Sequence, residues 1–263
     1  MNEQEKIELF FEIFDATLPR LGPGDDASTK KALSALLSSG IRQGDDSPRS
    51  IKLRILDLGC GNGAQTIQLA KHTGGTILAV DNHQPYLDEL RRRAEAEGVS
   101  DRIQPYLRDM RDLGLEKEAF DVIWSEGAIY IMGFRDGLAA CHRLLAPRGA
   151  LAATELSWLK PDPPDECRKF FSDEYPAMAD VDTNLATIKA CEYEVLGHFA
   201  LPESAWWDGY YHPLEERLQS IREKYATDQE KLEVVESTQV EIEFYRKYSS
   251  YYGYVFYLMQ RCA

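Results

Sequence analysis

Three glycines at alternate positions, Gly59, Gly61 and Gly63, follow an apolar segment that ends near Asp57, and a helix-compatible stretch comes next at 64–72. A strand that ends in a turn without side chains, followed at once by a helix, lets a nucleotide-like ligand lie against the backbone. The segment therefore predicts the first strand–turn–helix unit of a nucleotide-binding sheet.

A second acidic residue supports this prediction. The apolar segment 76–80 is typical of a buried parallel strand, and Asp81 follows it directly, 20 residues after Gly61. At this spacing in a strand–helix–strand unit, a carboxylate accepts hydrogen bonds from ribose hydroxyls. One alternative stays open, because Asp81 could instead cap the following helix, in which Pro85 occupies an early position.

The glycine pattern also fits G-x-G-x-x-A, which is typical of enzymes that bind nicotinamide or flavin dinucleotides. Three features favour a different nucleotide. Asp57 would meet a ligand's ammonium group well but a pyrophosphate poorly. Gly63 is expected to open the turn itself rather than to serve strand–helix packing. A dinucleotide enzyme normally adds a second nucleotide-binding half or a substrate domain, and 263 residues leave little room for one.

From residue 52 onward, apolar segments alternate with amphipathic ones. We expect strands over 52–58, 76–80, 103–108, 120–125, 149–156, 193–199 and 254–259, and helices over 64–72, 85–97 and 134–145. This alternation predicts an α/β fold with a mostly parallel, seven-stranded sheet, helices on both faces and ligands at the carboxyl ends of the strands. The glycines, Asp81, Asp109 and Glu126 all fall at such ends.

These motifs are similar to those of the class I S-adenosylmethionine-dependent methyltransferases, and the resemblance covers nearly the whole chain. The similar segments are 57–63 (first motif), Val80-Asp81-Asn82 (ribose motif), Arg108-Asp109-Met110 (adenine motif), 120–126 (fourth strand and its exit) and 144–151 (the turn into strand five). More narrowly, Gly22-Pro23-Gly24 and 124–130 resemble bacterial small-molecule methyltransferases that are labelled as related to ubiquinone/menaquinone-type C-methyltransferases.

The resemblance implies a Rossmann-like fold and methyl transfer from S-adenosylmethionine to a small-molecule acceptor, with S-adenosylhomocysteine as the product. It implies that the cofactor is held at its methionine end, its ribose and its adenine by Asp57, Gly59, Gly61, Asn62, Gly63, Asp81, Asn82, Asp109 and Met110. Asp109 has an alternative role as a hydrogen-bond acceptor within a turn. Cys60 is expected to be a small residue that fills this crowded turn.

The residues expected nearest the transferred methyl group are Glu126 and Tyr130, because strand four neighbours strand one at the switch point of the sheet. Glu126 could contact the cofactor's positive charge or take a proton from the acceptor, and a salt-bridge or helix-capping role is the alternative. His212 is the candidate base, since it lies within an aromatic stretch that also contains Trp206, Trp207, Tyr210 and Tyr211.

We expect residues 1–263 to form one methyltransferase domain in three kinds of segment. Residues 1–50 form an N-terminal helical cap, broken at 22–26, with Ser28 or Thr29 capping a helix through Leu37 and a polar linker over 40–50. Residues 51–156 form the cofactor-binding core. The segments 157–190 and 202–253 are insertions that are expected to form a lid over the substrate.

The composition of the chain limits the classes of partner that it is expected to bind. The formal charge of −14, from 30 basic and 44 acidic residues, disfavours nucleic acid and anionic membranes. We find no secretory signal, no membrane span, no C-x-x-C pair among the five cysteines and no metal-ligand spacing. We therefore expect a cytoplasmic monomer or homodimer without a metal. The alternative functions are a nicotinamide-dependent oxidoreductase and a non-catalytic S-adenosylmethionine-binding protein.

Overall fold

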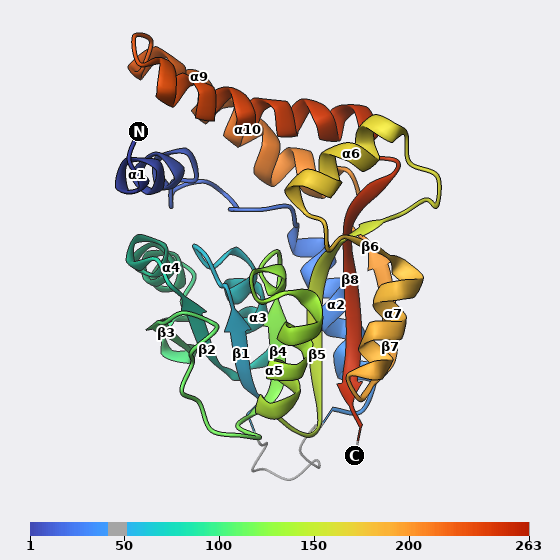
Figure 1. Cartoon of the computed structure of the whole chain (residues 1–263). Helices are drawn as coiled ribbons and strands as arrows, with labels where there is room; N and C mark the ends of the chain where they lie inside the picture. The colour runs from blue at the N-terminus through green and yellow to red at the C-terminus, as the bar shows by residue number, and fades with distance from the viewer. Residues whose placement is uncertain (42–51, 263) are drawn as a thin grey trace.

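The computed structural model describes residues 1–41 and 52–262, so most of the expected linker over 40–50 lies outside the described residues. The centre is one sheet with the strand order β3-β2-β1-β4-β5-β8-β7, and a short strand, β6, pairs with β5 (Figure 1). The strands are β1 (Arg54–Leu58), β2 (Thr76–Asp81), β3 (Ile103–Leu107), β4 (Phe120–Ser125), β5 (Leu145–Trp158), β6 (Ala179–Asp180), β7 (Tyr193–Ala200) and β8 (Tyr252–Arg261). The expected α/β fold with seven main strands is confirmed.

The direction of the strands creates the place for a ligand. Strand β1 lies between β2 and β4 and is parallel to both, so the chain order reverses beside it. In open α/β sheets, ligands bind at the carboxyl ends of the strands at such a switch point. Strand β8 is antiparallel to both β5 and β7 and completes the sheet.

Helices cover both faces of the sheet. One face packs against α2 (Asp26–Ser38), α3 (Ala64–Thr73) and α4 (Gln84–Ala96), and the other against α5 (Phe134–Leu144) and α7 (Val181–Ala190). A short 3-10 turn, η1 (Ser100–Arg102), precedes β3. The helices follow the apolar periodicity of the sequence: Leu87, Leu90 and Ala94 of α4 share one buried face.

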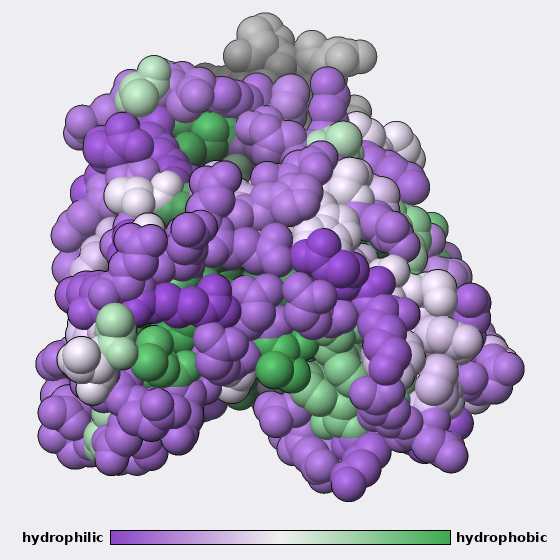
Figure 2. All heavy atoms as spheres, turned by 90° about the horizontal axis from the view of Figure 1, so that it is seen from above, coloured by the Kyte–Doolittle hydropathy of each residue, from purple (hydrophilic) through white to green (hydrophobic). Residues whose placement is uncertain are grey.

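A further layer of helices lies above the carboxyl ends of the parallel strands (Figure 1). It consists of α1 (Glu3–Ile13), α6 (Asp165–Glu174), α8 (Ser204–Trp206), the π-helical turn η3 (Trp207–Tyr211), α9 (His212–Lys224) and α10 (Gln229–Tyr248). These elements share a third hydrophobic core of their own, which includes Leu9, Trp206, Leu218 and Ile242. Seen from above, this layer is mostly hydrophilic, with hydrophobic residues in the recesses (Figure 2).

The structure divides the segments that were expected to form the cap and the lid. Only α1 and the segment after it lie above the sheet, whereas α2 packs beside α3 on one face of the sheet, against β5, β7 and β8. Likewise, α6 joins the upper layer but α7 packs on the sheet face. No helix within residues 1–41 and 52–262 combines the length and apolar character needed to cross a membrane.

The start of α2 differs from the sequence prediction. Asp25, rather than Ser28 or Thr29, is the N-cap residue, and its Oδ1 accepts a hydrogen bond from the Ser28 backbone N–H at 2.6 Å. Aspartate caps helices as well as serine does, so the sequence alone could not decide between them. Thr29 is consequently free to bond elsewhere, and it contacts Glu126.

Candidate functional site

A pocket of about 660 Å³ is lined by residues at the carboxyl ends of the parallel strands and by residues of the upper helical layer. This volume is within the range of ligand sites, which is about 300–1,000 Å³. The sequence-predicted residues that line it are Gly59, Gly61, Asn62, Asp81, Asn82, Asp109, Met110, Glu126 and Tyr130. Three other predicted residues, Asp57, Gly63 and His212, do not line it.

The turn after β1 has the conformation that its glycines suggest. Gly59 and Gly61 have φ values of 69° and 53°, which residues with a side chain rarely adopt. A Cβ atom on Gly59 would lie 2.3 Å from Ala128 Cβ, so this position also lacks the space for one. The backbone N–H groups of Gly59 and Cys60 both donate to Val80 O at 2.9 Å, which fixes the turn to the end of β2.

Asp57 supports the turn from behind instead of facing the pocket. Its side chain is fully buried, and it accepts hydrogen bonds from Thr66 Oγ1 at 2.6 Å and from Gln65 Nε2 at 3.4 Å. Gln65 Nε2 also donates to Cys60 O at 3.3 Å and so joins Asp57 to the turn. Burial raises the pKa of Asp57 to about 7. The expectation that Asp57 meets a ligand directly is therefore not supported by its position.

Gly63 corrects a second expectation. It is the N-cap residue of α3 with φ of 86°, and a Cβ atom there would lie 2.2 Å from Leu90 Cδ1 of α4. The glycine thus permits close packing between the turn and a neighbouring helix. Gly63 therefore does serve packing, contrary to the sequence prediction, and this feature no longer disfavours a dinucleotide.

Asp81 joins the glycine turn to the start of α4 and also lines the pocket. Its Oδ2 accepts the Gly61 N–H and its Oδ1 accepts the His83 N–H, both at 3.0 Å. His83, not Asp81, is the N-cap residue of α4, so the capping alternative is excluded in its simple form. Burial raises the pKa of Asp81. Each carboxylate oxygen has two lone pairs, so both can accept a further hydrogen bond.

The end of β3 contributes Asp109 and Met110. Asp109 is exposed, and its Oδ1 accepts the Arg111 backbone N–H at 2.8 Å, which is the turn role that the sequence left open. It nevertheless lines the pocket beside Met110 and the exposed Asn82. A Cβ on Gly59 would lie 3.2 Å from Met110 Cε, so the methionine packs close to the glycine turn.

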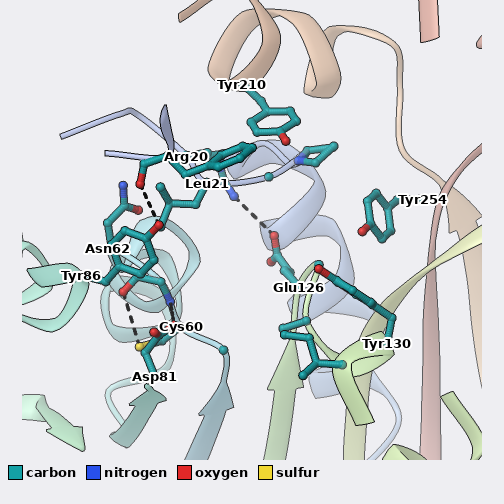
Figure 3. A pocket seen from close by; sticks show the side chains of 18 of the residues that line it. Arg20, Leu21, Cys60, Asn62, Asp81, Tyr86, Glu126, Tyr130, Tyr210 and Tyr254 are labelled. Carbon is teal, nitrogen blue, oxygen red and sulfur yellow. Dashed lines mark hydrogen bonds and ion pairs between the residues drawn. The ribbon is translucent and has the colours of Figure 1, made fainter. Parts of the chain in front are cut away.

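Glu126 lines the pocket beside Arg20 (Figure 3), and three other side chains hold it. Its Oε1 accepts hydrogen bonds from Thr29 Oγ1 at 2.7 Å and Trp124 Nε1 at 2.8 Å, and Arg20 Nη1 lies 3.4 Å from its Oε2. Burial raises the pKa of Glu126, and the Arg20 charge opposes this shift. The structure therefore shows the salt-bridge role, and Trp124 is fully buried in the sheet.

The segment between α1 and α2 closes one side of the pocket, which the sequence analysis did not detect in detail. Asn62 Nδ2 donates to Ala16 O at 3.0 Å and to Leu18 O at 2.7 Å. Arg93 Nη2 donates to the same Leu18 carbonyl at 2.7 Å, and Tyr86 OH donates to a backbone carbonyl at the end of α1. Asn62 thus binds this segment as well as lining the pocket.

The upper end of the pocket, which we call the aromatic compartment, is formed mainly by the helical layer. Its residues are Leu156, Phe170, Phe171, Glu174, Trp206, Tyr210, Tyr211, Glu241, Tyr252 and Tyr254. Tyr130 from the 3-10 turn η2 (Ile129–Met132) also lines the pocket and is 43% exposed. The two carboxylates and Tyr254 have no sequence motif, since only the packing of distant segments brings them together.

The aromatic stretch divides at the turn η3. Trp206, Tyr210 and Tyr211 line the aromatic compartment, but Trp207 packs outside it under the Arg246 guanidinium, 4.5 Å from the ring centroid. His212 is exposed at the start of α9. The structure therefore does not place His212 where it could act as a base on a ligand in this pocket.

Comparison with known proteins finds similarity in the part of the chain that contains the glycine turn. Residues 55–149 match the family model described as a methyltransferase domain. The methyltransferase GfsG of Streptomyces halstedii is 33% identical over 104 residues, which are 39% of this chain and 37% of the relative. The sterol 24-C-methyltransferase ERG6 of Saccharomyces cerevisiae is 25% identical over 186 residues, 67% of this chain and 46% of the relative. The chain thus spans less than half the length of these curated relatives.

A solved structure extends the likeness to the whole fold. A SAM-dependent methyltransferase from Geobacter sulfurreducens, determined in complex with S-adenosyl-L-homocysteine, aligns with a TM-score of 0.77 and 21% identity. The alignment covers 96% of this chain and 97% of that one. The helical layer above the sheet therefore belongs to a fold that is known in full, and the class I methyltransferase resemblance is confirmed at the level of fold and domain.

Proposed function

We propose that this protein is an enzyme that transfers a methyl group from S-adenosylmethionine to a small-molecule acceptor. The observation that carries this proposal is the continuous pocket between the glycine turn with Asp81 and the aromatic compartment. A pocket of about 660 Å³ has room for a nucleoside-sized cofactor and an acceptor beside it. The methyltransferase-domain match over residues 55–149 supports the same function.

The residues of the sheet edge fit the chemistry of S-adenosylmethionine. The side-chain-free turn at Gly59 and Gly61 lets a ligand approach the backbone, and the Asp81 oxygens can accept hydrogen bonds from ribose hydroxyls. Met110 and Asp109 would contact the adenine. When bound, S-adenosylmethionine supplies an activated methyl group on its sulfonium.

The remaining pocket residues would hold the cofactor and the acceptor in place and would not take part in the reaction chemically. Glu126 would order the pocket wall through Arg20 and Trp124, and Tyr130 would contact the acceptor at the boundary of the aromatic compartment. The helical layer would exclude water and hold the acceptor close to the methyl group, which is the main requirement of this reaction. We assign no general base.

The alternative, a nicotinamide-dependent oxidoreductase, is favoured by one observation, the close packing of Gly63 against Leu90. The two functions are separated by measuring the melting temperature with S-adenosylmethionine, S-adenosylhomocysteine, NAD and NADP. We expect only the first two to raise it, since a ligand at 100 times its Kd stabilises a protein by about 2.7 kcal/mol. A shift with a dinucleotide alone would overturn the proposal.

Turnover is then tested by S-adenosylhomocysteine formation in the presence of phenols, quinols, amines, thiols and halides. The variant Gly59→Val, whose added side chain would clash with Ala128, should lose both cofactor binding and turnover. Gly74→Ala is the matched control, because Gly74 has φ of 62° but no atom within 4 Å of an added Cβ. Cofactor binding without any product from the panel would favour the non-catalytic binding protein.

We also propose that the enzyme acts in the cytoplasm as a monomer or homodimer, without nucleic acid as a partner. The support is the net charge of −14 and the five free cysteines. The similarity to quinone-type C-methyltransferases stays a prediction.

A further inference from the structure

The aromatic compartment presents tyrosine hydroxyl groups that have no hydrogen-bond partner in the part of the chain that the structure describes. Tyr210 and Tyr252 are only 7% and 3% exposed and line the pocket, as do the less buried Tyr130 and Tyr254. No hydroxyl of these four has a hydrogen-bond partner among the described residues. Figure 3 shows Tyr130, Tyr210 and Tyr254 reaching into the pocket from three different elements. Because buried tyrosines normally bond their hydroxyl groups, this arrangement indicates a ligand with polar atoms.

Two carboxylates give the compartment its charge. Glu174 of α6 and Glu241 of α10 both line the pocket. Glu241 Oε1 accepts a hydrogen bond from Tyr211 OH at 3.0 Å. Neither carboxylate forms an ion pair with any lysine, arginine or histidine in the described part of the chain, whereas Glu126 lies beside Arg20.

The electrostatic surroundings show that this negative charge is not compensated. The side chains of Glu174 and Glu241 are both exposed to solvent, yet desolvation by the helices packed around Glu241 raises its pKa, and the nearby negative charge of Glu174 raises it further. A positively charged ligand would remove both penalties, since an opposite charge favours the ionised carboxylate. An anionic ligand would increase them.

The walls of the compartment suit the same kind of ligand. Trp206, Phe171 and the four tyrosines provide aromatic faces and edges around the two carboxylates. Aromatic faces attract ammonium groups, most strongly where water is excluded. The same faces also bury an apolar ligand body.

We propose that the acceptor of this enzyme carries a cationic amino or ammonium group on an apolar body, and that Glu241, with Glu174 beside it, selects for that charge. This inference rests on the proposed methyl-transfer function and adds the substrate class. Glu241 is then a specificity-determining residue, separate from the cofactor end of the pocket.

The test uses three ligands of matched shape: 4-phenylbutylamine, 4-phenylbutanol and 4-phenylbutyrate. Each is titrated calorimetrically into the full chain saturated with S-adenosylhomocysteine. We expect the amine to bind at least about tenfold more tightly than the alcohol, and the carboxylate to bind most weakly. Glu241→Gln should weaken amine binding by about 10- to 100-fold and change alcohol binding by less than about twofold.

Controls separate this inference from the proposed function. Glu233→Gln changes a carboxylate of the same helix that does not line the pocket, and it should leave every affinity unchanged. Glu174→Gln is the second variant if Glu241→Gln fails to fold, and it should weaken the amine selectively. Amine binding that is undetectable, no tighter than alcohol binding, or unaffected by these variants overturns the inference. A loss of S-adenosylhomocysteine affinity in Glu241→Gln that is as large as its loss of amine affinity also overturns the inference. If the unmodified protein binds neither S-adenosylmethionine nor S-adenosylhomocysteine, the proposed function itself fails.

Discussion

The Arg20 guanidinium joins two parts of the chain: its Nη1 lies 3.4 Å from Glu126 Oε2, and its Nη2 lies 2.8 Å from Asp26 Oδ1. The Glu126 side chain is 5% exposed and the Arg20 side chain 10%. The segment after α1 is therefore attached both to the end of β4 and to the first turn of α2. The position of the pocket wall depends on this attachment.

A double-mutant cycle measures this attachment. Arg20→Met and Glu126→Gln should each lower the free energy of unfolding by about 1–3 kcal/mol, because each removes one charge of a buried ion pair and leaves the other charge less well compensated. The loss for Glu126→Gln should lie at the lower end of this range, because Arg20 keeps its ion pair with Asp26. The double variant should lose less than the sum. Strictly additive losses in urea unfolding would show that the two side chains do not interact.

Gly63→Ala tests the packing of the turn against α4. We expect a loss of about 2–4 kcal/mol, from the left-handed backbone and from the clash with Leu90 together. Gly74→Ala has the backbone cost alone and should lose about 1–2 kcal/mol. Leu90→Ala removes the side chain that the added Cβ would meet. The loss in free energy of unfolding that Leu90→Ala causes should therefore be smaller in the Gly63→Ala background than in the unmodified protein. Equal losses for the two glycine variants would contradict the clash.

Asp81→Ala should weaken binding of S-adenosylmethionine by about 1–3 kcal/mol, because it removes a charged acceptor at the pocket wall. It should also loosen the turn, since the Gly61 and His83 N–H groups lose their acceptor. Calorimetry measures the affinity, and Asp101→Ala, at an exposed position in η1, is the control. Unchanged affinity would leave Asp81 with only its role in the turn.

Glu155 predicts a pH dependence of stability. It is 2% exposed, Tyr175 OH donates to its Oε1, and its Oε2 has no hydrogen-bond partner among the described residues. Burial raises its pKa from 4.5 to about 7. Between these two values the unfolded chain releases a proton that the folded chain keeps. Stability is thus fully present below about pH 4.5 and falls as the pH rises, by up to about 1.4 kcal/mol per pH unit.

The variant Glu155→Gln lacks this titration, while the raised pKa of Asp57 is present in both proteins and cancels. Relative to the unmodified protein, the variant should therefore be more stable at pH 8 than at pH 5, by about 1–3 kcal/mol in urea unfolding. Glu233→Gln should show no such trend. A stability difference that is the same at both pH values would rule out a raised pKa for Glu155.

The sequence was sufficient for the sheet because each strand and helix carries its own apolar periodicity. The ends of the individual strands were less certain: the strand expected over 149–156 is β5, which spans Leu145–Trp158. The glycine turn and Asp81 were found because their spacing along the chain is local. The orientation of Asp57 was not found, since a buried carboxylate within a strand gives no sign of which partners it meets.

The upper half of the pocket could not be predicted from local patterns. Glu241, Tyr254 and Arg20 lie far apart in the chain, and only the packing of the helical layer brings them to one cavity. The aromatic stretch indicated a ligand-binding segment, but the π-helical turn decides which of its rings face inward. His212 lies just beyond that turn and faces solvent. Its place in the aromatic stretch of the sequence therefore wrongly suggested that it lies in the pocket.

The pocket wall runs from Phe10 to Tyr254 along the chain. During synthesis, the glycine turn would leave the ribosome long before the residues that close the cavity above it. Helix α1 could bury its apolar residues only after α9 and α10 have been synthesised, because these helices share one hydrophobic core. Ligand binding at this site thus requires the chain from Phe10 to Tyr254 to be synthesised and folded. A bound cofactor would stabilise molecules that are folded over this whole range and slow their degradation, whereas shorter fragments would lack that protection.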